Sequence, residues 1–256
     1  MAIPADIAGK NKCRLDTLLF ERGLAESRTR AQALIMSGQV FSETQRFDKP
    51  GMQVSLDTPI TLKGQDHPWV SRGGVKLAHA LEQFSLGPID LVCMDVGAST
   101  GGFTDVLLQH GAAKVFALDV GHGQLAWKLR NDERVIVLEK TNVRHIGPKE
   151  IPEPVDLVVS DVSFISLTVA LPAALKMTKP SAKLVTLIKP QFEVGKGQVG
   201  KGGVVRDAEL HEEVCHRIQT WVNDLPEWSV SGLAESPITG PKGNKEFLLF
   251  AEKNSA

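Results

Sequence analysis

Hydrophobic residues in this chain follow one pattern before residues 65–68 and another beyond them. In the second part, runs rich in Val, Leu and Ile alternate with stretches of helical spacing. Nearly continuous apolar runs are typical of parallel strands that are covered on both faces, and their alternation with helices predicts a doubly wound α/β sheet. Strands are expected at 91–96, 113–120, 135–138, 155–160 and 183–188, two closing strands at 228–234 and 246–252, and a helix from 104 to 110.

The first part of the chain has shorter apolar clusters separated by charged residues. Leucines at helical spacing predict a helix over 14–22, which Gly23 ends. Ser27 is placed to cap a second helix that ends at Gly38, and short strands are expected at 39–41 and 52–56. About 60 residues of this kind predict a small α+β module appended to the larger domain.

Composition narrows the class of protein. The chain has 256 residues and a formal net charge of -1, which excludes coating of nucleic acid by bulk charge but not a local basic face. Cys13, Cys93 and Cys215 are far apart, so we expect reduced thiols and no metal site. No apolar stretch approaches the ~18 residues of a membrane helix and no signal peptide is evident, so we expect a cytoplasmic protein that does not bind membranes.

A glycine-rich loop joins the first predicted strand of the larger domain to the next helix. Glycine is needed where backbone turns sharply or approaches a ligand closely. The loop lacks the GxGxxG of dinucleotide-binding proteins and the GKS or GKT of nucleoside triphosphate loops. A tight turn without a ligand is the alternative to a binding loop. The loop consists of Gly97, Ala98, Ser99, Thr100, Gly101, Gly102 and Phe103.

Three polar residues near strand ends suggest what the loop binds. Asp95 ends the first strand, where a carboxylate can meet the ammonium of a methionine moiety and would repel a pyrophosphate. Asp119, at the end of the second strand, can bind both ribose hydroxyls. Asn142, beyond the third strand, can read the adenine edge. Together they predict an S-adenosylmethionine site at the loop.

Further polar residues follow the later strands. Asp161 ends the fourth strand and Lys189 the fifth, and the carboxyl ends of such strands meet at the ligand-binding edge of the sheet. Burial beside another cation would lower the pKa of such a lysine and make it a general base towards a hydroxyl. A plain strand end is the alternative for Lys189, and an ordinary edge charge is the alternative for Glu246.

Longer motifs carry a resemblance to a known family. The chain resembles the TlyA family of ribosomal RNA 2′-O-methyltransferases, which also bears the label haemolysin A, along nearly its whole length. The motifs are Trp69-Val70-Ser71-Arg72-Gly73-Gly74-Val75-Lys76-Leu77, the stretch from Asp95 to Phe103, Asp119-Val120-Gly121-His122-Gly123-Gln124-Leu125, Asp161-Val162-Ser163-Phe164-Ile165-Ser166-Leu167, and Lys189-Pro190-Gln191-Phe192-Glu193-Val194-Gly195-Lys196.

The resemblance implies a Rossmann-like class I methyltransferase domain and a catalytic tetrad. By motif match the tetrad is Lys76, Asp161, Lys189 and Glu246, shared with FtsJ-type enzymes. It implies transfer of a methyl group from S-adenosylmethionine to a ribose 2′-hydroxyl, of cytidine as in the family, with no metal. Beyond the loop and its acids, it adds cofactor contacts from Val120, Asp161 and Phe164.

The N-terminal unit resembles the small RNA-binding domain shared by a small-subunit ribosomal protein and many pseudouridine synthases. The matching stretch contains Arg14-Leu15-Asp16, Gly23-Leu24, Ser27-Arg28, Ala31 and Gly38-Gln39-Val40. This implies an RNA-binding domain over 12–66, a linker over 67–75 and an FtsJ-like domain over 76–256. Expected RNA contacts are Arg14, Arg28, Arg30, Lys49, Lys140, Arg144 and Lys196, the last in a glycine-rich loop expected to close over RNA. A solvated helix face is the alternative for the arginines, and a plain flexible loop is the alternative for 195–203.

Three functions are possible for a chain with these features. We expect a monomeric rRNA methyltransferase that acts on ribosomal subunits. The haemolysin label offers a cytolysin instead, although no strongly amphipathic basic helix supports it. A non-catalytic RNA-binding factor is the third, and the intact tetrad argues against it. The sequence does not specify the modified nucleotide or the subunit that carries it.

Overall fold

The computed structural model describes residues 12–25, 27–62 and 67–254, and the chain divides into two compact units, 1–68 and 69–256. The expected linker, 67–75, does not match the start of the second unit. Trp69 and Val70 pack against a buried cluster of that unit, and its first helix begins at Gly73. Apolar burial thus draws most of the expected linker into the second unit.

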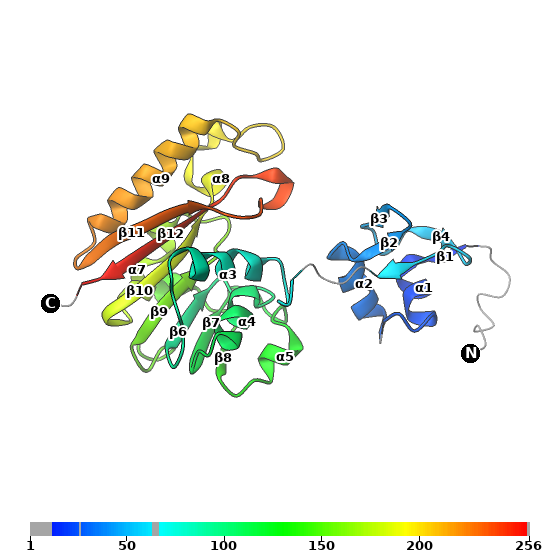
Figure 1. Cartoon of the computed structure of the whole chain (residues 1–256), viewed down its shortest axis with the longest axis horizontal. Helices are drawn as coiled ribbons and strands as arrows, with labels where there is room; N and C mark the ends of the chain where they lie inside the picture. The colour runs from blue at the N-terminus through cyan, green and yellow to red at the C-terminus, as the bar shows by residue number, and fades with distance from the viewer. Residues whose placement is uncertain (1–11, 26, 63–66, 255–256) are drawn as a thin grey trace. The chain divides into compact units, whose positions relative to one another are not determined.

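The first unit is a helix pair with short strands, as expected (Figure 1). Ser27 accepts a hydrogen bond from the backbone N–H of Arg30 at 3.1 Å, which confirms the predicted cap of the second helix. A small core forms between the helices and strands, with Leu15, Leu19 and Ile35 fully buried. The elements are α1 (Leu15–Glu21), α2 (Arg28–Met36), β1 (Lys12–Arg14), β2 (Val40–Ser42), β3 (Gln45–Phe47), β4 (Gln53–Ser55) and β5 (Thr61–Leu62).

The second unit is built on a seven-stranded sheet of order β11-β12-β10-β9-β6-β7-β8. The strands from β10 to β8 run parallel, and β12 and β11 add two antiparallel strands at one edge. This confirms the doubly wound α/β prediction. The strands are β6 (Val92–Val96), β7 (Lys114–Leu118), β8 (Val135–Leu138), β9 (Val155–Ser160), β10 (Thr178–Ile188), β11 (Trp228–Glu235) and β12 (Phe247–Lys253).

Helices cover both faces of this sheet (Figure 1). They are α3 (Gly73–Gln83), α4 (Gly102–Gln109), α5 (Trp127–Arg130), α6 (Leu167–Ala170), α7 (Pro172–Leu175), α8 (Pro190–Glu193) and α9 (Ala208–Asn223), with short 3₁₀ turns η1 (Val143–His145), η2 (Lys196–Gln198) and η3 (Pro241–Gly243).

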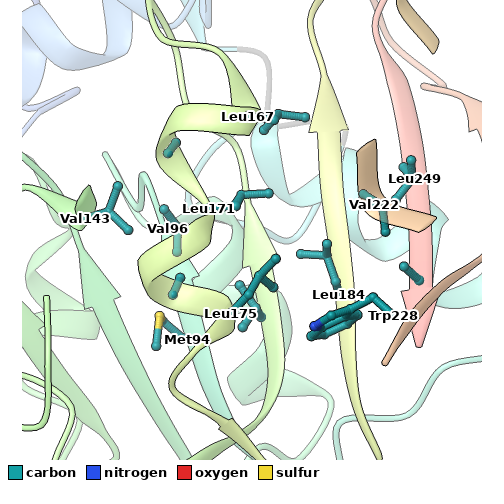
Figure 2. Close-up of a cluster of buried hydrophobic side chains, with 14 of the residues drawn as sticks. Met94, Val96, Val143, Leu167, Leu171, Leu175, Leu184, Val222, Trp228 and Leu249 are labelled. Carbon is teal, nitrogen blue, oxygen red and sulfur yellow. The ribbon is translucent and has the colours of Figure 1, made fainter. Parts of the chain in front are cut away.

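The sheet separates two buried clusters because successive strand residues point to opposite faces. Cys93 joins the cluster under α3, α4 and α5, whereas its neighbour Met94 joins the cluster under α6, α7 and α9. Figure 2 shows the second cluster, in which Leu167 comes from α6, Leu175 from α7 and Leu171 from between the two helices. This packing holds the carboxyl ends of the parallel strands at one edge, where the expected site residues lie.

Across the ranges that the structure describes, no helix combines the length and the apolar character needed to cross a membrane.

Candidate active site

The glycine loop joins β6 to α4 in a conformation that only glycine adopts easily. Gly97 and Gly101 have φ angles of +87° and +95°. A Cβ on Gly97 would lie 3.1 Å from the backbone oxygen of Asp161, so the loop passes close to the end of β9. A Cβ on Gly102 would lie 2.8 Å from the backbone nitrogen of Gly74, so α4 begins against the start of α3. The glycines therefore bring the loop within contact distance of two other segments.

Asp95 lies at the end of β6 but faces the interior. Its side chain is fully buried, and Oδ2 accepts hydrogen bonds from the backbone N–H of Thr104 at 2.9 Å and the hydroxyl of Thr104 at 2.7 Å. Burial raises the pKa of this carboxyl to about 7, while the bonds from Thr104 oppose the rise. Asp95 does not line the cavity described below. Asp95 therefore fixes the first turn of α4, and its expected contact with a ligand ammonium stays a prediction.

The other expected cofactor residues lie at or just beyond the ends of neighbouring strands. Asp119 follows β7 and accepts hydrogen bonds from the backbone N–H of Ser99 at 2.8 Å and of Gly121 at 2.7 Å, which ties it to the glycine loop. Val120 is 70% exposed. Asn142 caps η1 and accepts from the backbone N–H of Arg144 at 3.1 Å. None of these lines the cavity below.

Four charged side chains from four elements meet beside the loop. Lys76 comes from α3, Asp161 follows β9, Lys189 follows β10, and Glu246 precedes β12. Lys76 Nζ lies 2.5 Å from Glu246 Oε2 and 3.8 Å from Asp161 Oδ2, and Lys189 Nζ lies 2.5 Å from Asp161 Oδ1. Their order is thus Glu246, Lys76, Asp161, Lys189.

This set is mostly shielded from water. The side chains of Lys76 and Lys189 are each 9% exposed, that of Glu246 is 0% exposed, and that of Asp161 is 20% exposed. Charges buried to this extent need partners, because desolvation disfavours an isolated ion. Two lysines and two carboxylates balance formally, so the cluster supplies its own counter-ions.

The cluster and the glycine loop border one cavity of about 310 Å³. This volume is at the lower end of the range of small-molecule sites. Lys76, Asp161 and Lys189 line one part of the cavity, and residues 97–100, 102 and 103 line another. Glu246 stands behind Gly240, where a Cβ would lie 2.0 Å from its Oε1. The arrangement places charged side chains and the glycine loop around a common space.

Several residues of the cavity were missed by the sequence reasoning. Ser71, Arg72 and Gly73 at the start of α3 line it, as do Ser163 and the segment 238–240. Lys189 Nζ donates a hydrogen bond to the Ser163 hydroxyl at 2.8 Å. Ser71 and Ser163 lie inside the motifs that carry the family resemblance, two residues from Gly73 and Asp161. A serine in such a motif has no distinctive chemical signal that would mark it as a site residue.

Phe164 directly follows the cavity residue Ser163 and is 89% exposed. Its φ is +65°, which is unusual for an aromatic residue. The ring lies 4.8 Å from that of Phe192, centroid to centroid. It does not line the cavity itself.

The expected RNA-binding cations are mainly exposed. Arg14 and Arg28 both approach the buried carboxylate of Asp16, with Nη2 to Oδ2 distances of 2.7 Å and 3.6 Å. That environment, led by the hydrogen bond from Arg14, holds the pKa of Asp16 well below its usual range. Exposed side chains are also found at Arg30, Lys49, Lys140 and Arg144. Lys196 begins η2, and its side chain lies outside the described part of the structure.

Within the described residues, no group of three His, Cys, Asp or Glu side chains is arranged to hold a metal ion.

Comparison with known proteins gives two family matches. The model of FtsJ-like methyltransferases matches residues 69–253, and the model of the S4 domain matches residues 13–60. These ranges correspond to the second and the first structural unit.

Individual relatives match over most of the chain. A 16S/23S rRNA (cytidine-2′-O)-methyltransferase, TlyA, of Mycobacterium tuberculosis is 49% identical over 93% of this chain and 89% of its own. Hemolysin A of Brachyspira hyodysenteriae is 43% identical over 92% of this chain and 98% of its own. A solved structure of a candidate hemolysin from Streptococcus thermophilus is 44% identical, with a TM-score of 0.74 over 96% of this chain and 90% of that one.

Proposed function

Because this chain belongs to the FtsJ-like methyltransferase family, we propose that it transfers a methyl group from S-adenosylmethionine to the 2′-hydroxyl of a cytidine in ribosomal RNA. The observation that carries the proposal is the chain of contacts from Glu246 through Lys76 and Asp161 to Lys189, at the same cavity as the glycine loop. The choice of acceptor is supported by the rRNA (cytidine-2′-O)-methyltransferase TlyA, which is 49% identical over 93% of this chain.

The residues around the glycine loop fit this cofactor. Gly97 and Gly101 give the loop its left-handed turns, and Asp119 holds the backbone of Ser99 while remaining half-buried. A carboxylate there suits ribose hydroxyls. When bound, the cofactor supplies a methyl group on a sulfonium. The loop, with Asp119, Val120 and Asn142, would hold its adenosine.

The four charged residues divide the work at the acceptor. Lys189 Nζ takes or shares the proton of the ribose 2′-hydroxyl, which makes the oxygen nucleophilic. Asp161 Oδ1 holds this amine at 2.5 Å. Lys76, fixed by Glu246, helps to hold the nucleotide at the cavity wall. Much of the acceleration comes from placing the hydroxyl in line, because a sulfonium is already reactive.

The first unit supplies the RNA-binding component of the proposal. As an S4 domain, it presents Arg14, Arg28, Arg30 and Lys49 as phosphate contacts. Lys140, Arg144 and Lys196 would add contacts on the second unit. An rRNA substrate implies that the protein works in the cytoplasm, and we expect it to do so as a monomer without a metal.

Methyl transfer to defined RNA substrates tests the proposal. Purified protein and S-adenosylmethionine labelled in the methyl group are incubated with small subunits, large subunits and naked rRNA. We expect label in RNA, located by mass spectrometry at a cytidine ribose. Lys189→Ala should abolish incorporation, whereas Lys183→Ala, on the strand that directly precedes Lys189 and outside the cavity, should not.

Two outcomes contradict the proposal. No incorporation into any of the substrates would remove the enzymatic function and favour an RNA-binding factor. Lysis of erythrocytes by purified protein carrying Lys189→Ala would support the cytolysin that the names of relatives suggest.

A further inference from the structure

The amine of Lys189 has a second fixed partner besides Asp161. Its Nζ donates a hydrogen bond to the Ser163 hydroxyl at 2.8 Å and lies 2.5 Å from Asp161 Oδ1. Lys76 differs, because its Nζ approaches two carboxylate oxygens, at 2.5 Å from Glu246 and 3.8 Å from Asp161. A neutral hydroxyl partner thus distinguishes Lys189 from the other lysine of the cluster.

The loop that carries Ser163 is anchored at both ends. The backbone N–H of Asp161 donates to the backbone oxygen of Val96 at 3.1 Å. At the other end, the Ser166 hydroxyl and the backbone N–H of Leu167 each donate to Glu193 at 2.8 Å. Glu193 closes α8, and Lys189 directly precedes that helix. The position of Ser163 relative to Lys189 is therefore set by bonds that connect the same two segments.

An amine that accepts a proton has two N–H bonds and one lone pair. Each fixed partner of the amine removes directions that the lone pair could otherwise take. Ser163 accepts one N–H bond, the Asp161 carboxylate lies 2.5 Å away as the ion partner of the same amine, and Lys189 itself lines the cavity. We propose that Ser163 is a positioning residue that, with Asp161, orients the Lys189 amine so that its lone pair faces the ribose hydroxyl in the cavity. This inference rests on the proposed function.

The proton balance of the step is simple. Lys189 takes the proton of the 2′-hydroxyl while the methyl group forms a bond to that oxygen. At the same time the bond between the methyl group and the sulfur of the donor breaks. The lysine then carries three N–H bonds and a positive charge; Ser163 still accepts one of these bonds, and Asp161 lies beside the amine as its counter-ion. Ser163 gains and loses no proton in this scheme, so its effect is on geometry alone.

Two substitutions test the role of the hydroxyl. Ser163→Ala removes the acceptor, and Ser163→Thr retains it. The rate of methyl transfer is measured in a single turnover at saturating S-adenosylmethionine and rRNA, and the Kd of each ligand is measured separately. We expect Ser163→Ala to lower the saturated rate by about 10- to 100-fold, the range that misplacement of a reacting group produces. Both Kd values should stay within about twofold, and Ser163→Thr should recover the rate to within about threefold.

The control is Ser231→Ala. Like Ser163, Ser231 is exposed and its hydroxyl is hydrogen-bonded to a charged side chain, since Ser231 on β11 donates to Glu252 on β12. Its rate should match that of the wild type. An unchanged rate in Ser163→Ala overturns the inference, as does a Thr variant that is as slow as the Ala variant. A weaker Kd that accounts for the whole loss makes Ser163 a binding contact and also overturns it. If the wild type transfers no methyl group, the proposed function itself has failed.

Discussion

Replacing Gly102 by alanine tests the close approach of two helices at the cavity. Gly102 is the first residue of α4, where this helix meets the start of α3. A Cβ there would lie 2.3 Å from the Ser71 hydroxyl oxygen, 2.8 Å from the backbone nitrogen of Gly74 and 3.2 Å from the carbonyl carbon of Gly73. The serine side chain can rotate away. The two backbone atoms cannot, so a helix or the loop must shift.

The size of the effect follows from the crowding. Overpacking at such a site costs about 1 to 3 kcal/mol, and the contact with backbone favours the upper part of this range. Alanine regains less than about 1 kcal/mol of helix propensity, since Gly102 is at the helix end. A net loss of about 2 kcal/mol lowers the melting temperature of a domain of this size by about 4 to 8 °C.

Gly102→Ala should also weaken the binding of S-adenosylmethionine. Gly102, Ser71 and Gly73 all line the cavity, so relief of the clash changes its wall. We expect the Kd for S-adenosylmethionine, measured by isothermal titration calorimetry, to rise tenfold or more, which corresponds to about 1.4 kcal/mol. Gly87→Ala is the matched control, because Gly87 is exposed and its Cβ would meet no atom within 4 Å.

A Gly102→Ala protein that melts within about 1 °C of the wild type and binds S-adenosylmethionine equally well would refute the reasoning. The contact between α3 and α4 would then be looser than the structure shows. Equal losses in both glycine variants would also refute it, because open space surrounds Gly87.

Three further predictions concern charged groups. Glu246→Gln should cost about 3 to 5 kcal/mol in urea denaturation and abolish methyl transfer, since it leaves Lys76 buried beside a neutral amide; an unchanged stability would contradict the buried pair. Burial raises the pKa of Asp95 to about 7, so its contribution to stability is present below pH 4 and is lost as the pH rises through 7. Asp95→Asn should flatten the resulting decline of the unfolding free energy between pH 4 and 8. An identical slope in both proteins would contradict this prediction. Arg28→Ala should weaken rRNA binding and lower its salt slope by about 1, whereas Arg22→Ala, whose guanidinium binds backbone oxygens of its own unit, should keep the slope.

The local elements could be predicted because their signals lie within a few residues. The apolar runs at 135–138 and 155–160 became β8 and β9 with the same bounds. The run at 183–188 became only the second half of β10, which begins at Thr178. The first half of β10 could not be recognised because it contains Lys179, Pro180 and Ser181. In this half the pairing with β9 shifts register between Thr178 and Lys183. A polar, irregular strand segment lacks the periodicity on which such a prediction depends.

The site was predicted partly from residues and partly by resemblance. The glycine loop and the strand-end position of Asp161 follow from local pattern. Lys76 does not, because a lysine on an amphipathic helix looks like any surface charge. Its role came from the family motif, and the structure brings its amine to 2.5 Å from Glu246, 170 residues away in the chain.

The sequence by itself therefore determined the strands of the larger domain apart from the first half of β10, the cap at Ser27, the glycine loop and the family, since each depends on neighbouring residues or on contiguous motifs. Only the tertiary structure decided that Asp95 bonds to Thr104 inside the domain and that Ser163 reaches Lys189. The first outcome depends on the face to which a strand residue points, and the second on the pairing of β9 with β10, which brings the segments after these strands together. Those are settled by packing across the whole sheet, and no short stretch of sequence contains them.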